Sequence, residues 1–287
     1  MADPSQVRSF YAGKNFFITG GTGFVGLCLI EKILRCIPDS GKIYLLMRPK
    51  KGKEIADRLQ EFPKNPVFEK LLESNSTDVF KKLIPIAGDV GEENLGMSPQ
   101  DRQTIIDNVN VVMIHVSSAY VNSYLTEAHE KIYEAPEDPE KVISLVGTLN
   151  DEALLEIEPK LLKSHPNTYT FTKHLAEHEV VKCADLFPCT IVRPTMIVAS
   201  WKEPIPGWTC SKVGPQGFLM GAAKADYIPV DVVVNQLLVA GWEAANSSSG
   251  LTVYHCSSST CHPFTWTMLD DTVNGMLHKY PLKSAVW

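Results

Sequence analysis

A tyrosine and a lysine four residues apart are the side chains in this sequence best suited to proton chemistry. Tyr169 and Lys173 lie in residues 167–186, whose pattern predicts a helix, and their spacing places both on one helix face. The lysine ammonium favours the phenolate electrostatically, which makes Tyr169 a usable proton donor to an oxygen that gains negative charge. Ser117 and Ser118, at the end of an expected strand, can offer hydroxyls to the same oxygen. These four residues form a candidate catalytic group, although such a tyrosine–lysine pair alone is more often an ordinary helix surface.

A glycine-rich turn lies upstream, between an expected strand at residues 14–19 and an expected helix at residues 24–37. Its glycines follow the order GxxGxxG. Gly20 allows the tight turn, Gly23 lets the backbone approach a pyrophosphate, and Gly26 lets the helix pack close to the strand. Phosphates would then lie against free N–H groups at the positive end of the helix. The candidate pyrophosphate site comprises Gly20, Gly21, Thr22, Gly23, Phe24 and Gly26.

The end of the second expected strand, residues 42–47, indicates which dinucleotide the site prefers. NAD-preferring sites usually place an acid there to hold the ribose 2′-hydroxyl. Here the strand runs into Arg48-Pro49-Lys50-Lys51, and such cations would pair with a 2′-phosphate. Arg48, with Lys50 as a helper, therefore predicts NADPH as the cofactor; the alternative is a solvated basic loop.

Asp89 and Val90 follow the third expected strand, at residues 82–87. A carboxylate at this strand end can accept a hydrogen bond from an adenine amino group. A simple turn aspartate in Gly-Asp-Val is almost as good an interpretation.

Strands and helices alternate along the whole chain, which predicts an α/β fold: a doubly wound, parallel-sheet Rossmann fold of the extended short-chain dehydrogenase/reductase kind. We expect residues 1–195 to form an NADPH-binding Rossmann domain and residues 196–287 to form a small substrate-binding lobe interleaved with its sheet. Further strands are expected at residues 109–116, 189–193 and 251–256. Further helical segments are expected at residues 53–72 (broken), 99–108, 140–146, 151–162, 230–245 and 265–279.

Composition bounds the class of protein. The 287 residues, 44% of them hydrophobic, suffice for one large α/β core, and a net charge of −6 argues against a nucleic-acid partner. Seven cysteines without a CxxC pair, and a start without a signal-like apolar stretch, predict reduced thiols in a cytosol-facing protein. We expect no membrane-spanning segment in this chain, because no apolar run approaches about 20 residues. The histidines, among them His115, His165, His174 and His178, show no metal-ligand pattern, so no metal is expected.

A series of segments in this sequence resembles, in the same order, the NADPH-dependent fatty acyl-CoA reductases of animals. The resemblance covers nearly the whole chain, and WKEPIPGW and IPVDVVVN are its most family-specific parts. The segments are TGGTGFVG, LLMRPKKG, GDV, HVSSAY, NTYTFTKHLAE, IVRPTMIVASWKEPIPGW, GPQGFLMGAAK, DYIPVDVVVN and HPFTW…HKYPLK.

The resemblance implies reduction of a long-chain acyl-CoA to a primary alcohol through an aldehyde-level intermediate, with consumption of two NADPH. Ser118, where family members usually carry Thr, and Tyr169 would hold the oxyanion, and Lys173 would bind the nicotinamide ribose. The acyl group would be expected at residues 201–217. The family's relatives lie on peroxisomal or endoplasmic-reticulum membranes. The loop that they place beside the nicotinamide corresponds to Arg193, Pro194 and Thr195.

The chain departs from the family pattern at three places. Residues 110–112 run directly into residues 113–117, where relatives have a strand–helix–strand crossover of roughly 30 residues. Residues 221–224 join residues 225–227 without a further stretch that relatives have, and the sequence stops at Trp287, where relatives continue into membrane-associated apolar segments. We expect a sheet without one strand to expose apolar edges or to pair again around the gap.

Two alternative functions stay open at this point. One is another extended NADPH-dependent reductase that acts on a steroid, a flavonoid or a sugar nucleotide. The other is a catalytically impaired nucleotide-binding variant. The sequence does not indicate an oligomeric state.

Overall fold

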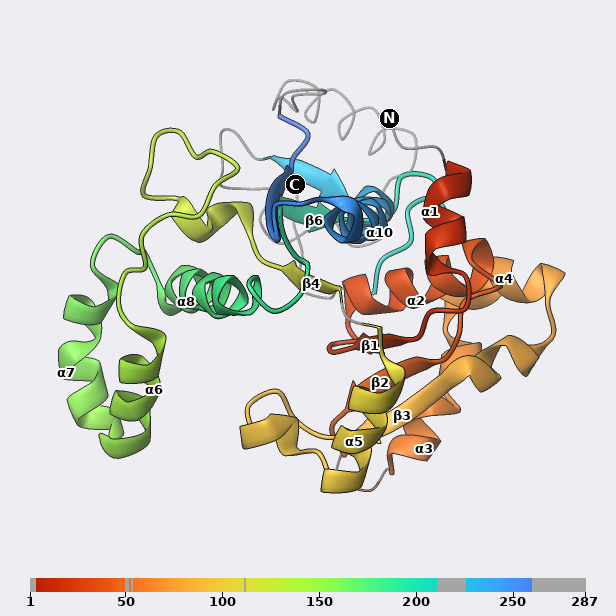
Figure 1. Ribbon diagram of the computed structural model, residues 1–287, viewed down its shortest axis with the longest axis horizontal. Helices are drawn as coiled ribbons and strands as arrows, with labels where there is room; N and C mark the ends of the chain where they lie inside the picture. The colour runs from red at the N-terminus through yellow and green to blue at the C-terminus, as the bar shows by residue number, and fades with distance from the viewer. Residues whose placement is uncertain (1–3, 50–51, 53, 111, 211–225, 260–287) are drawn as a thin grey trace, which may run out of the picture.

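Parallel strands alternate with helices in the computed structural model, which describes residues 4–49, 52, 54–110, 112–210 and 226–259 (Figure 1). Within these residues every strand pair is parallel, which confirms the predicted α/β class. One sheet has the order β1-β2-β3, a second has the order β4-β5-β8, and β6 pairs with β7. The strands are β1 (Phe16–Ile18), β2 (Ile43–Met47), β3 (Leu83–Ala87), β4 (Met113–Val116), β5 (Cys189–Pro194), β6 (Met196–Val198), β7 (Tyr227–Pro229) and β8 (Leu251–Cys256).

The helices confirm most of the expected segments. The region expected as a broken helix consists of two short α-helices separated by 3-10 turns, and α1 was not expected. The expected helix at residues 265–279 lies outside the described residues. The α-helices are α1 (Pro4–Tyr11), α2 (Phe24–Cys36), α3 (Ile55–Leu59), α4 (Glu69–Ser74), α5 (Pro99–Asn108), α6 (Pro139–Thr148), α7 (Asp151–Leu162), α8 (Thr168–Cys183) and α10 (Val230–Asn246).

The sheet is interrupted, as expected for a sheet without one strand. Within the described residues no ladder joins β1 to β4, so the parallel sheet is divided into two half-sheets. The expected strand at residues 109–116 is also shorter, because β4 begins only at Met113. Residues 109–112 link α5 directly to β4, and among the described residues β4 pairs with β5 and not with β1. One edge of β1 and one edge of β4 are therefore without a strand partner among the described residues.

Helix α10 holds the two half-sheets together. One stripe of the helix, with Val230, Val234 and Leu238, belongs to the core that packs around β1 and β2. A second stripe, with Val233 and Leu237, packs with residues of β5 and β8. Helix α10 also contacts α1, α2 and β4. The helix thus takes over the contact that a continuous sheet would have made.

Gly241 lies where parts of both halves approach α10. A Cβ built on Gly241 would lie 2.5 Å from the Tyr11 hydroxyl oxygen and 2.6 Å from Cδ1 of Ile114 in β4. The Tyr11 hydroxyl donates a hydrogen bond to the Leu238 carbonyl at 2.8 Å. A side chain at residue 241 would therefore displace both neighbours.

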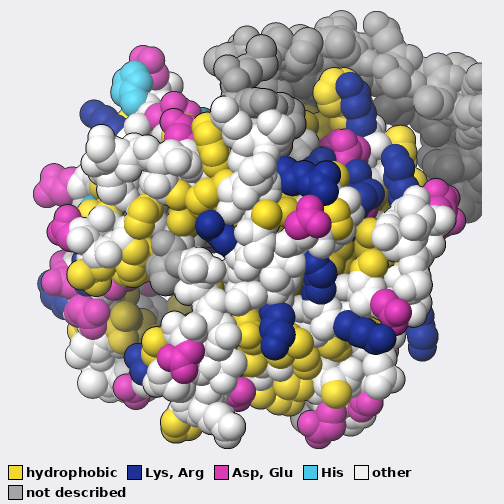
Figure 2. All heavy atoms as spheres, turned by 45° about the vertical axis from the view of Figure 1, so that its right-hand side comes forward, with side chains coloured by type: hydrophobic (Ala, Val, Ile, Leu, Met, Phe, Trp, Pro, Cys, Tyr) yellow, Lys and Arg dark blue, Asp and Glu magenta, His cyan; other side chains and the backbone are white. Residues whose placement is uncertain are grey.

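Exposed ion pairs add little to the stability of the fold. On the face that brings α1 and α4 forward, Lys and Arg side chains lie among Asp and Glu side chains (Figure 2). The pair Arg8–Asp39, at 2.9 Å, has both side chains more than half exposed, and exposed pairs of this kind contribute little. None of the described helices combines the length and the apolar character that crossing a membrane requires.

We predict that Gly241→Ala lowers the free energy of unfolding by about 1–3 kcal/mol, because the new methyl group overpacks the contact between α10, Tyr11 and Ile114. Gly147→Ala is the matched control, since Gly147 is also helical and a Cβ there meets nothing within 4 Å. The control should gain about 0.5–1 kcal/mol from the usual preference of helices for alanine. Chemical denaturation of both variants provides the measurement, and equal stabilisation of both would contradict the close packing at Gly241.

Candidate active site

The glycine turn between β1 and α2 is packed as tightly as glycine permits. Gly20 has a positive φ of 69°, which side-chain-bearing residues rarely adopt. A Cβ on Gly26 would collide with the Gly20 carbonyl oxygen and come within 2.7 Å of the Gly21 Cα. Gly23 is the N-cap of α2 and provides no side-chain cap. The start of α2 therefore has backbone N–H groups without a side-chain acceptor at the cap, as a phosphate group requires.

The ends of β2 and β3 bring Arg48 and Asp89 together. A guanidinium nitrogen of Arg48 lies 3.5 Å from a carboxylate oxygen of Asp89, with side-chain exposures of 71% and 34%. Asp89 also accepts a hydrogen bond from the Gly91 N–H at 3.0 Å, as a turn aspartate does. Val90 is exposed, and Lys50 lies outside the described residues. The cofactor roles of these residues stay predictions, and the exposed Arg48 head is accessible to an anion.

Helix α8 carries the tyrosine and the lysine. Asn167 caps its start by accepting the Thr170 N–H at 3.0 Å. Tyr169 is 55% exposed, and among the residues that the structure describes none makes a hydrogen bond with its hydroxyl. The Lys173 ammonium donates to the Val116 carbonyl at 2.8 Å, and burial lowers the pKa of Lys173. The helix is thereby attached to the end of β4, directly before the two serines.

The two serines differ in what their hydroxyls do. Both are buried, but the Ser117 hydroxyl donates to a Glu177 carboxylate oxygen at 2.5 Å. The Ser118 oxygen instead accepts the Tyr120 N–H at 3.2 Å, where it caps the 3-10 turn η5 (Ala119–Asn122). Because this bond uses the oxygen of Ser118 and not its proton, Ser118 can still donate to a substrate oxygen. The arrangement favours Ser118 over Ser117 as the hydroxyl donor.

The residues after the middle of β5 face the protein interior. Arg193 is fully buried, and its guanidinium binds the Glu177 carboxylate at 2.9 and 2.7 Å. The Thr195 hydroxyl donates to Asp226 at 3.2 Å. Arg193 and Pro194 are the last two residues of β5, paired with His255 and Cys256 of β8, so the stretch expected as a loop is largely strand. The cofactor role of Arg193, Pro194 and Thr195 stays a prediction.

Glu177 is a residue of this site that sequence reasoning missed. It lies four residues after Lys173, on the same face of α8, and is fully buried. The spacing Tyr169, Lys173, Glu177 was a readable signal, since every fourth residue recurs on one helix face.

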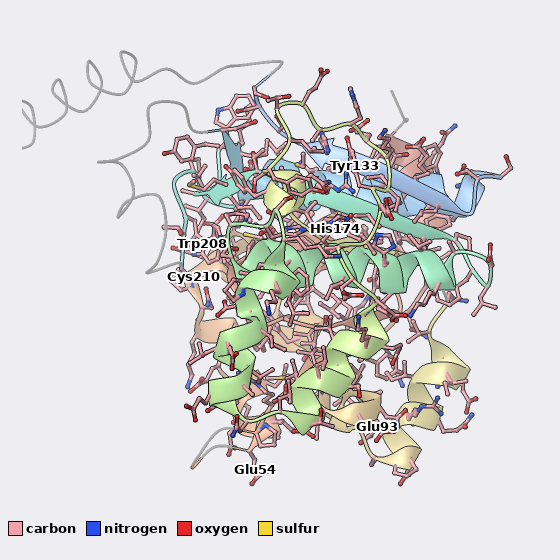
Figure 3. All side chains as sticks on the ribbon, turned by 90° about the vertical axis from the view of Figure 1, so that its left-hand side faces the viewer. Glu54, Glu93, Tyr133, His174, Trp208 and Cys210 are labelled. Atoms are coloured by element: carbon pink, nitrogen blue, oxygen red, sulfur yellow. The ribbon has the colours of Figure 1, made fainter. Side chains whose placement is uncertain are left out.

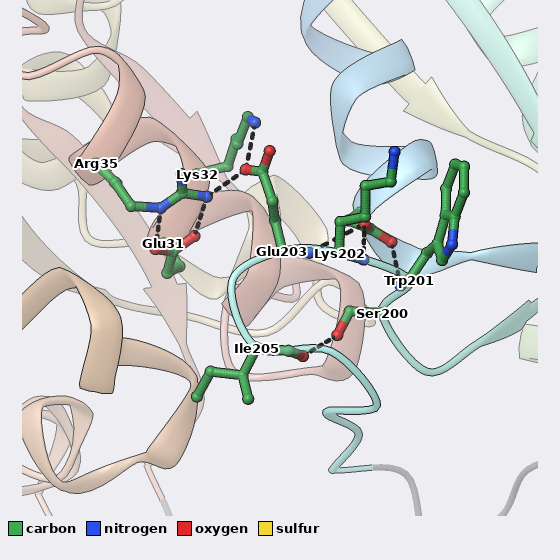
Figure 4. A network of polar contacts seen from close by, with 9 residues as sticks. Glu31, Lys32, Arg35, Ser200, Trp201, Lys202, Glu203 and Ile205 are labelled. Atoms are coloured by element: carbon green, nitrogen blue, oxygen red, sulfur yellow. Dashed lines mark hydrogen bonds and ion pairs between the residues drawn. The ribbon is translucent and has the colours of Figure 1, made fainter.

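The loop after β6 is attached to both α2 and α10. The Asp231 carboxylate accepts the N–H groups of Trp201, Lys202 and Glu203 at 2.8, 2.8 and 3.1 Å. Glu203 in turn pairs with Lys32 at 2.8 Å and with Arg35 at 2.6 Å (Figure 4). These cations hold the pKa of Glu203 down at about 2.

The same loop reaches the glycine turn. Its Trp208 ring lies 5.5 Å, centroid to centroid, from the ring of Phe24, the first residue of α2. Residues 201–210 of the expected acyl region thus lie beside the dinucleotide turn, and residues 211–217 lie outside the described part.

A glycine turn after β1, basic residues after β2 and a Tyr-x-x-x-Lys helix against a parallel sheet define an extended short-chain dehydrogenase/reductase. The family model described as "Male sterility protein", an NAD-binding model, matches residues 18–113 and 111–237. The chain belongs to this family, that of the fatty acyl-CoA reductases. The two matched segments meet at residues 111–113, at the link where the sheet is divided.

Curated relatives agree with this family. A Drosophila melanogaster protein named as a fatty acyl-CoA reductase, CG8306, is 51% identical over 342 aligned positions, which cover 99% of this chain and 66% of that protein. Human fatty acyl-CoA reductase 1 is 32% identical and covers 98% of this chain and 64% of its own length. The chain thus spans slightly less than two thirds of these relatives. Both alignments are longer than this chain, so the relatives contain internal residues that have no counterpart here.

Solved structures show the same fold at low sequence identity. The terminal R domain of the myxalamid PKS-NRPS pathway has a TM-score of 0.60 and 18% identity, covering 92% of this chain and 70% of that domain. The reductase domain of a non-ribosomal peptide synthetase from Mycobacterium tuberculosis has a TM-score of 0.58 and 16% identity, covering 99% and 77%. They support the Rossmann-type assignment.

We predict that Gly26→Ala abolishes most nicotinamide-dinucleotide binding, because the methyl group would force α2 away from Gly20 and Gly21. A ligand present at about a hundred times its dissociation constant adds about 2.7 kcal/mol to stability, which a thermal melt detects readily. The unmodified chain should show this rise, Gly147→Ala should keep it, and Gly26→Ala should lose it. An undiminished shift in Gly26→Ala would show that the ligand binds elsewhere.

Proposed function

We propose that this chain reduces a long-chain acyl-CoA to the primary alcohol with NADPH as the reductant. The observation that carries the proposal is the attachment of α8 to the end of β4. The Lys173–Val116 hydrogen bond of 2.8 Å places the tyrosine helix against the strand end that carries Ser118. Family membership supports the substrate class, because the curated relatives are named fatty acyl-CoA reductases.

The residues around the glycine turn fit a dinucleotide. The close approach at Gly26 leaves the start of α2 directly beside the turn, and Gly23 leaves the helix cap without a side chain. Arg48 would bind the 2′-phosphate of NADPH through charge-assisted hydrogen bonds. Each bound NADPH would supply one hydride, so conversion of an acyl thioester to an alcohol requires two NADPH in succession.

The side chains of this chain act on the oxygen of the acyl group. In the first stage the Ser118 hydroxyl and Tyr169 stabilise the negative charge that develops on the thioester oxygen. Collapse of this tetrahedral species breaks the carbon–sulfur bond, and the thiolate of coenzyme A leaves with the bonding electron pair. The remaining aldehyde keeps its oxygen at the same two donors.

Proton transfer completes the second stage. Tyr169 gives its proton to the aldehyde oxygen as the carbon is reduced, which yields the alcohol, and the tyrosinate is then reprotonated from solvent. Lys173, four residues along the same face, stabilises the negative charge of the tyrosinate and would bind the nicotinamide ribose. Altogether one acyl-CoA, two NADPH and two protons give one alcohol, two NADP⁺ and free coenzyme A.

A second candidate function is nucleotide binding without turnover. The division of the sheet between β1 and β4 favours it, because this division separates the half that carries the glycine turn from the half that carries Tyr169. The two candidates differ in one assay: both expect NADPH to raise the melting temperature, and only the reductase consumes NADPH when palmitoyl-CoA is added.

We predict that Tyr169→Phe lowers the turnover of palmitoyl-CoA by at least about a hundredfold, within the usual contribution of general acid catalysis. The thermal shift by NADPH should be unchanged, because the phenol is not part of the glycine turn. Tyr124→Phe is the matched control, since Tyr124 is another partly exposed tyrosine and its hydroxyl lies 3.4 Å from Asn122. NADPH consumption and fatty alcohol formation are measured together. An equal rate in Tyr169→Phe and the unmodified chain would remove Tyr169 from the mechanism.

We predict that Arg48→Ala weakens NADPH binding by about tenfold or more, because a charge-assisted hydrogen bond contributes about 1.5–3 kcal/mol. NADH binding should change little, since NADH has no 2′-phosphate. Arg102→Ala is the control. It removes an exposed arginine on α5 and should leave the binding of both cofactors unchanged. Fluorescence titration with both cofactors measures the ratio of the two affinities. An unchanged ratio in Arg48→Ala would assign the 2′-phosphate to other residues.

A further inference from the structure

A fully buried ion pair lies beneath the candidate catalytic group. Arg193 of β5 and Glu177 of α8 both have side chains that are 0% exposed. The guanidinium donates to one carboxylate oxygen at 2.9 Å and to the other at 2.7 Å, a two-point contact. Such a contact fixes the relative orientation of both groups as well as their distance.

The pair connects four parts of the chain. The Glu177 oxygen that binds Arg193 at 2.9 Å also accepts the Ser117 hydroxyl at 2.5 Å, at the end of β4. The remaining guanidinium donors reach the carbonyls of His129 and Lys131, at 3.2 and 3.0 Å. Helix α8, the ends of β4 and β5 and the segment 129–131 thus converge on one carboxylate and one guanidinium.

Stability alone does not account for a charge pair in this place. Removing both charges from water costs several kcal/mol for each ion, and apolar residues of similar volume often stabilise a core as well or better. An apolar pair would not fix the orientation of the polar groups beside it. The Glu177–Arg193 pair gives Ser117 a defined acceptor and holds the next residue, Ser118, with its oxygen toward the Tyr120 N–H.

Three histidines surround the Glu177–Arg193 pair. They face it from three elements: His115 on β4, His174 on α8 and His255 on β8. Burial lowers the pKa of each, for His115 and His174 to about 4, so these two are neutral near pH 7. The segment that contains Tyr133 passes beside α8 near His174 (Figure 3).

Arg193 occupies both oxygens of Glu177, whereas the Lys173 ammonium donates to the Val116 carbonyl. Burial lowers the pKa of Lys173, and the carboxylate four residues away opposes this effect.

We propose that Glu177 and Arg193 are positioning residues of the reductase, which fix the Ser117–Ser118 strand end and the Tyr169–Lys173 helix relative to each other. This inference rests on the proposed function. Neither residue touches the reacting atoms, and both act through Ser117, through the carboxyl end of β5 and through the charge balance at Lys173.

The test is Glu177→Gln, which keeps an oxygen for Ser117 and removes the charge. We expect kcat for palmitoyl-CoA to fall by about tenfold to a hundredfold, the effect of a small misplacement of catalytic groups, with KM for NADPH changed less than about threefold. The high-pH decline of kcat should also move to lower pH. Lys173 acts as a cation, so activity is lost as pH rises through its pKa, and loss of the neighbouring carboxylate lowers that pKa.

Two further variants separate positioning from folding. Arg193→Lys keeps the charge but loses the two-point contact, so kcat should fall while the high-pH decline stays in place. The double variant Glu177→Gln/Arg193→Met carries no unpaired buried charge and should fold where a single variant does not. It should have the same low kcat as Glu177→Gln. Glu179→Gln is the matched control, because Glu179 is also on α8 and forms an ion pair, with Lys182 at 2.7 Å, but at the surface. Its kcat and pH profile should equal those of the unmodified chain.

Hydrogen exchange gives a readout that does not require turnover. Peptides that cover residues 117–122 should exchange about tenfold faster in Glu177→Gln and in the double variant, and at the unmodified rate in Glu179→Gln. Unchanged exchange at residues 117–122 overturns the proposal, and so does a kcat in Glu177→Gln equal to that in Glu179→Gln. If the unmodified chain binds NADPH but never consumes it, the proposed function fails, and the exchange result alone decides whether Glu177 fixes this strand end.

Discussion

The packing of α10 against both half-sheets is the contact on which the rest of the molecule depends. Residues 109–112 link α5 directly to β4, and no described strand joins β1 to β4. The two stripes of α10 replace the missing ladder with apolar burial, which has no fixed direction. The precision of the arrangement must then come from contacts with defined geometry, such as the close approach of Tyr11 and Ile114 at Gly241.

Polar contacts fix the orientation of neighbouring elements in each of the two half-sheets that α10 joins. On the nucleotide side, Glu203 is bound by Lys32 and Arg35 of α2, so the loop after β6 follows the first half-sheet. On the catalytic side, Glu177 and Arg193 hold α8 to the ends of β4 and β5. Both networks join a loop or strand end to a helix, and the Glu177–Arg193 pair is fully buried.

Much of the fold could be predicted from the sequence because its signals are local. The buried run of β2, the glycine turn and the apolar spacing of α2 each depend on a few neighbouring residues. The strand expected at residues 109–116 was too long for a non-local reason: β4 forms only where it finds β5 as a partner, from Met113 to Val116. The short pair β6–β7 was missed because each strand has three residues and gains its stability from the other.

In the candidate site, too, local features could be predicted from the sequence and contacts between elements could not. The spacing of Tyr169 and Lys173 is a property of one helix, so the sequence sufficed to place both on one face. The partner of Arg193 could not be predicted from the sequence. The resemblance placed Arg193 beside the nicotinamide, whereas its guanidinium binds Glu177 in another element. The different tasks of Ser117 and Ser118 also depend on neighbours, Glu177 and the Tyr120 N–H, that no spacing reveals.

Asp231 holds the loop after β6 by its backbone. Its carboxylate binds three successive backbone N–H groups, at residues 201–203, and none of these bonds involves the side chain of the loop residue. At residues 201 and 202 the path of the loop therefore depends little on the side chain, whereas Glu203 also holds the loop through Lys32 and Arg35. Trp201, which is 60% exposed and lies under the Lys202 ammonium, can be replaced by another residue that has a backbone N–H without loss of these three bonds. One aspartate on α10 thus fixes this stretch of backbone while two of its side chains stay free to differ.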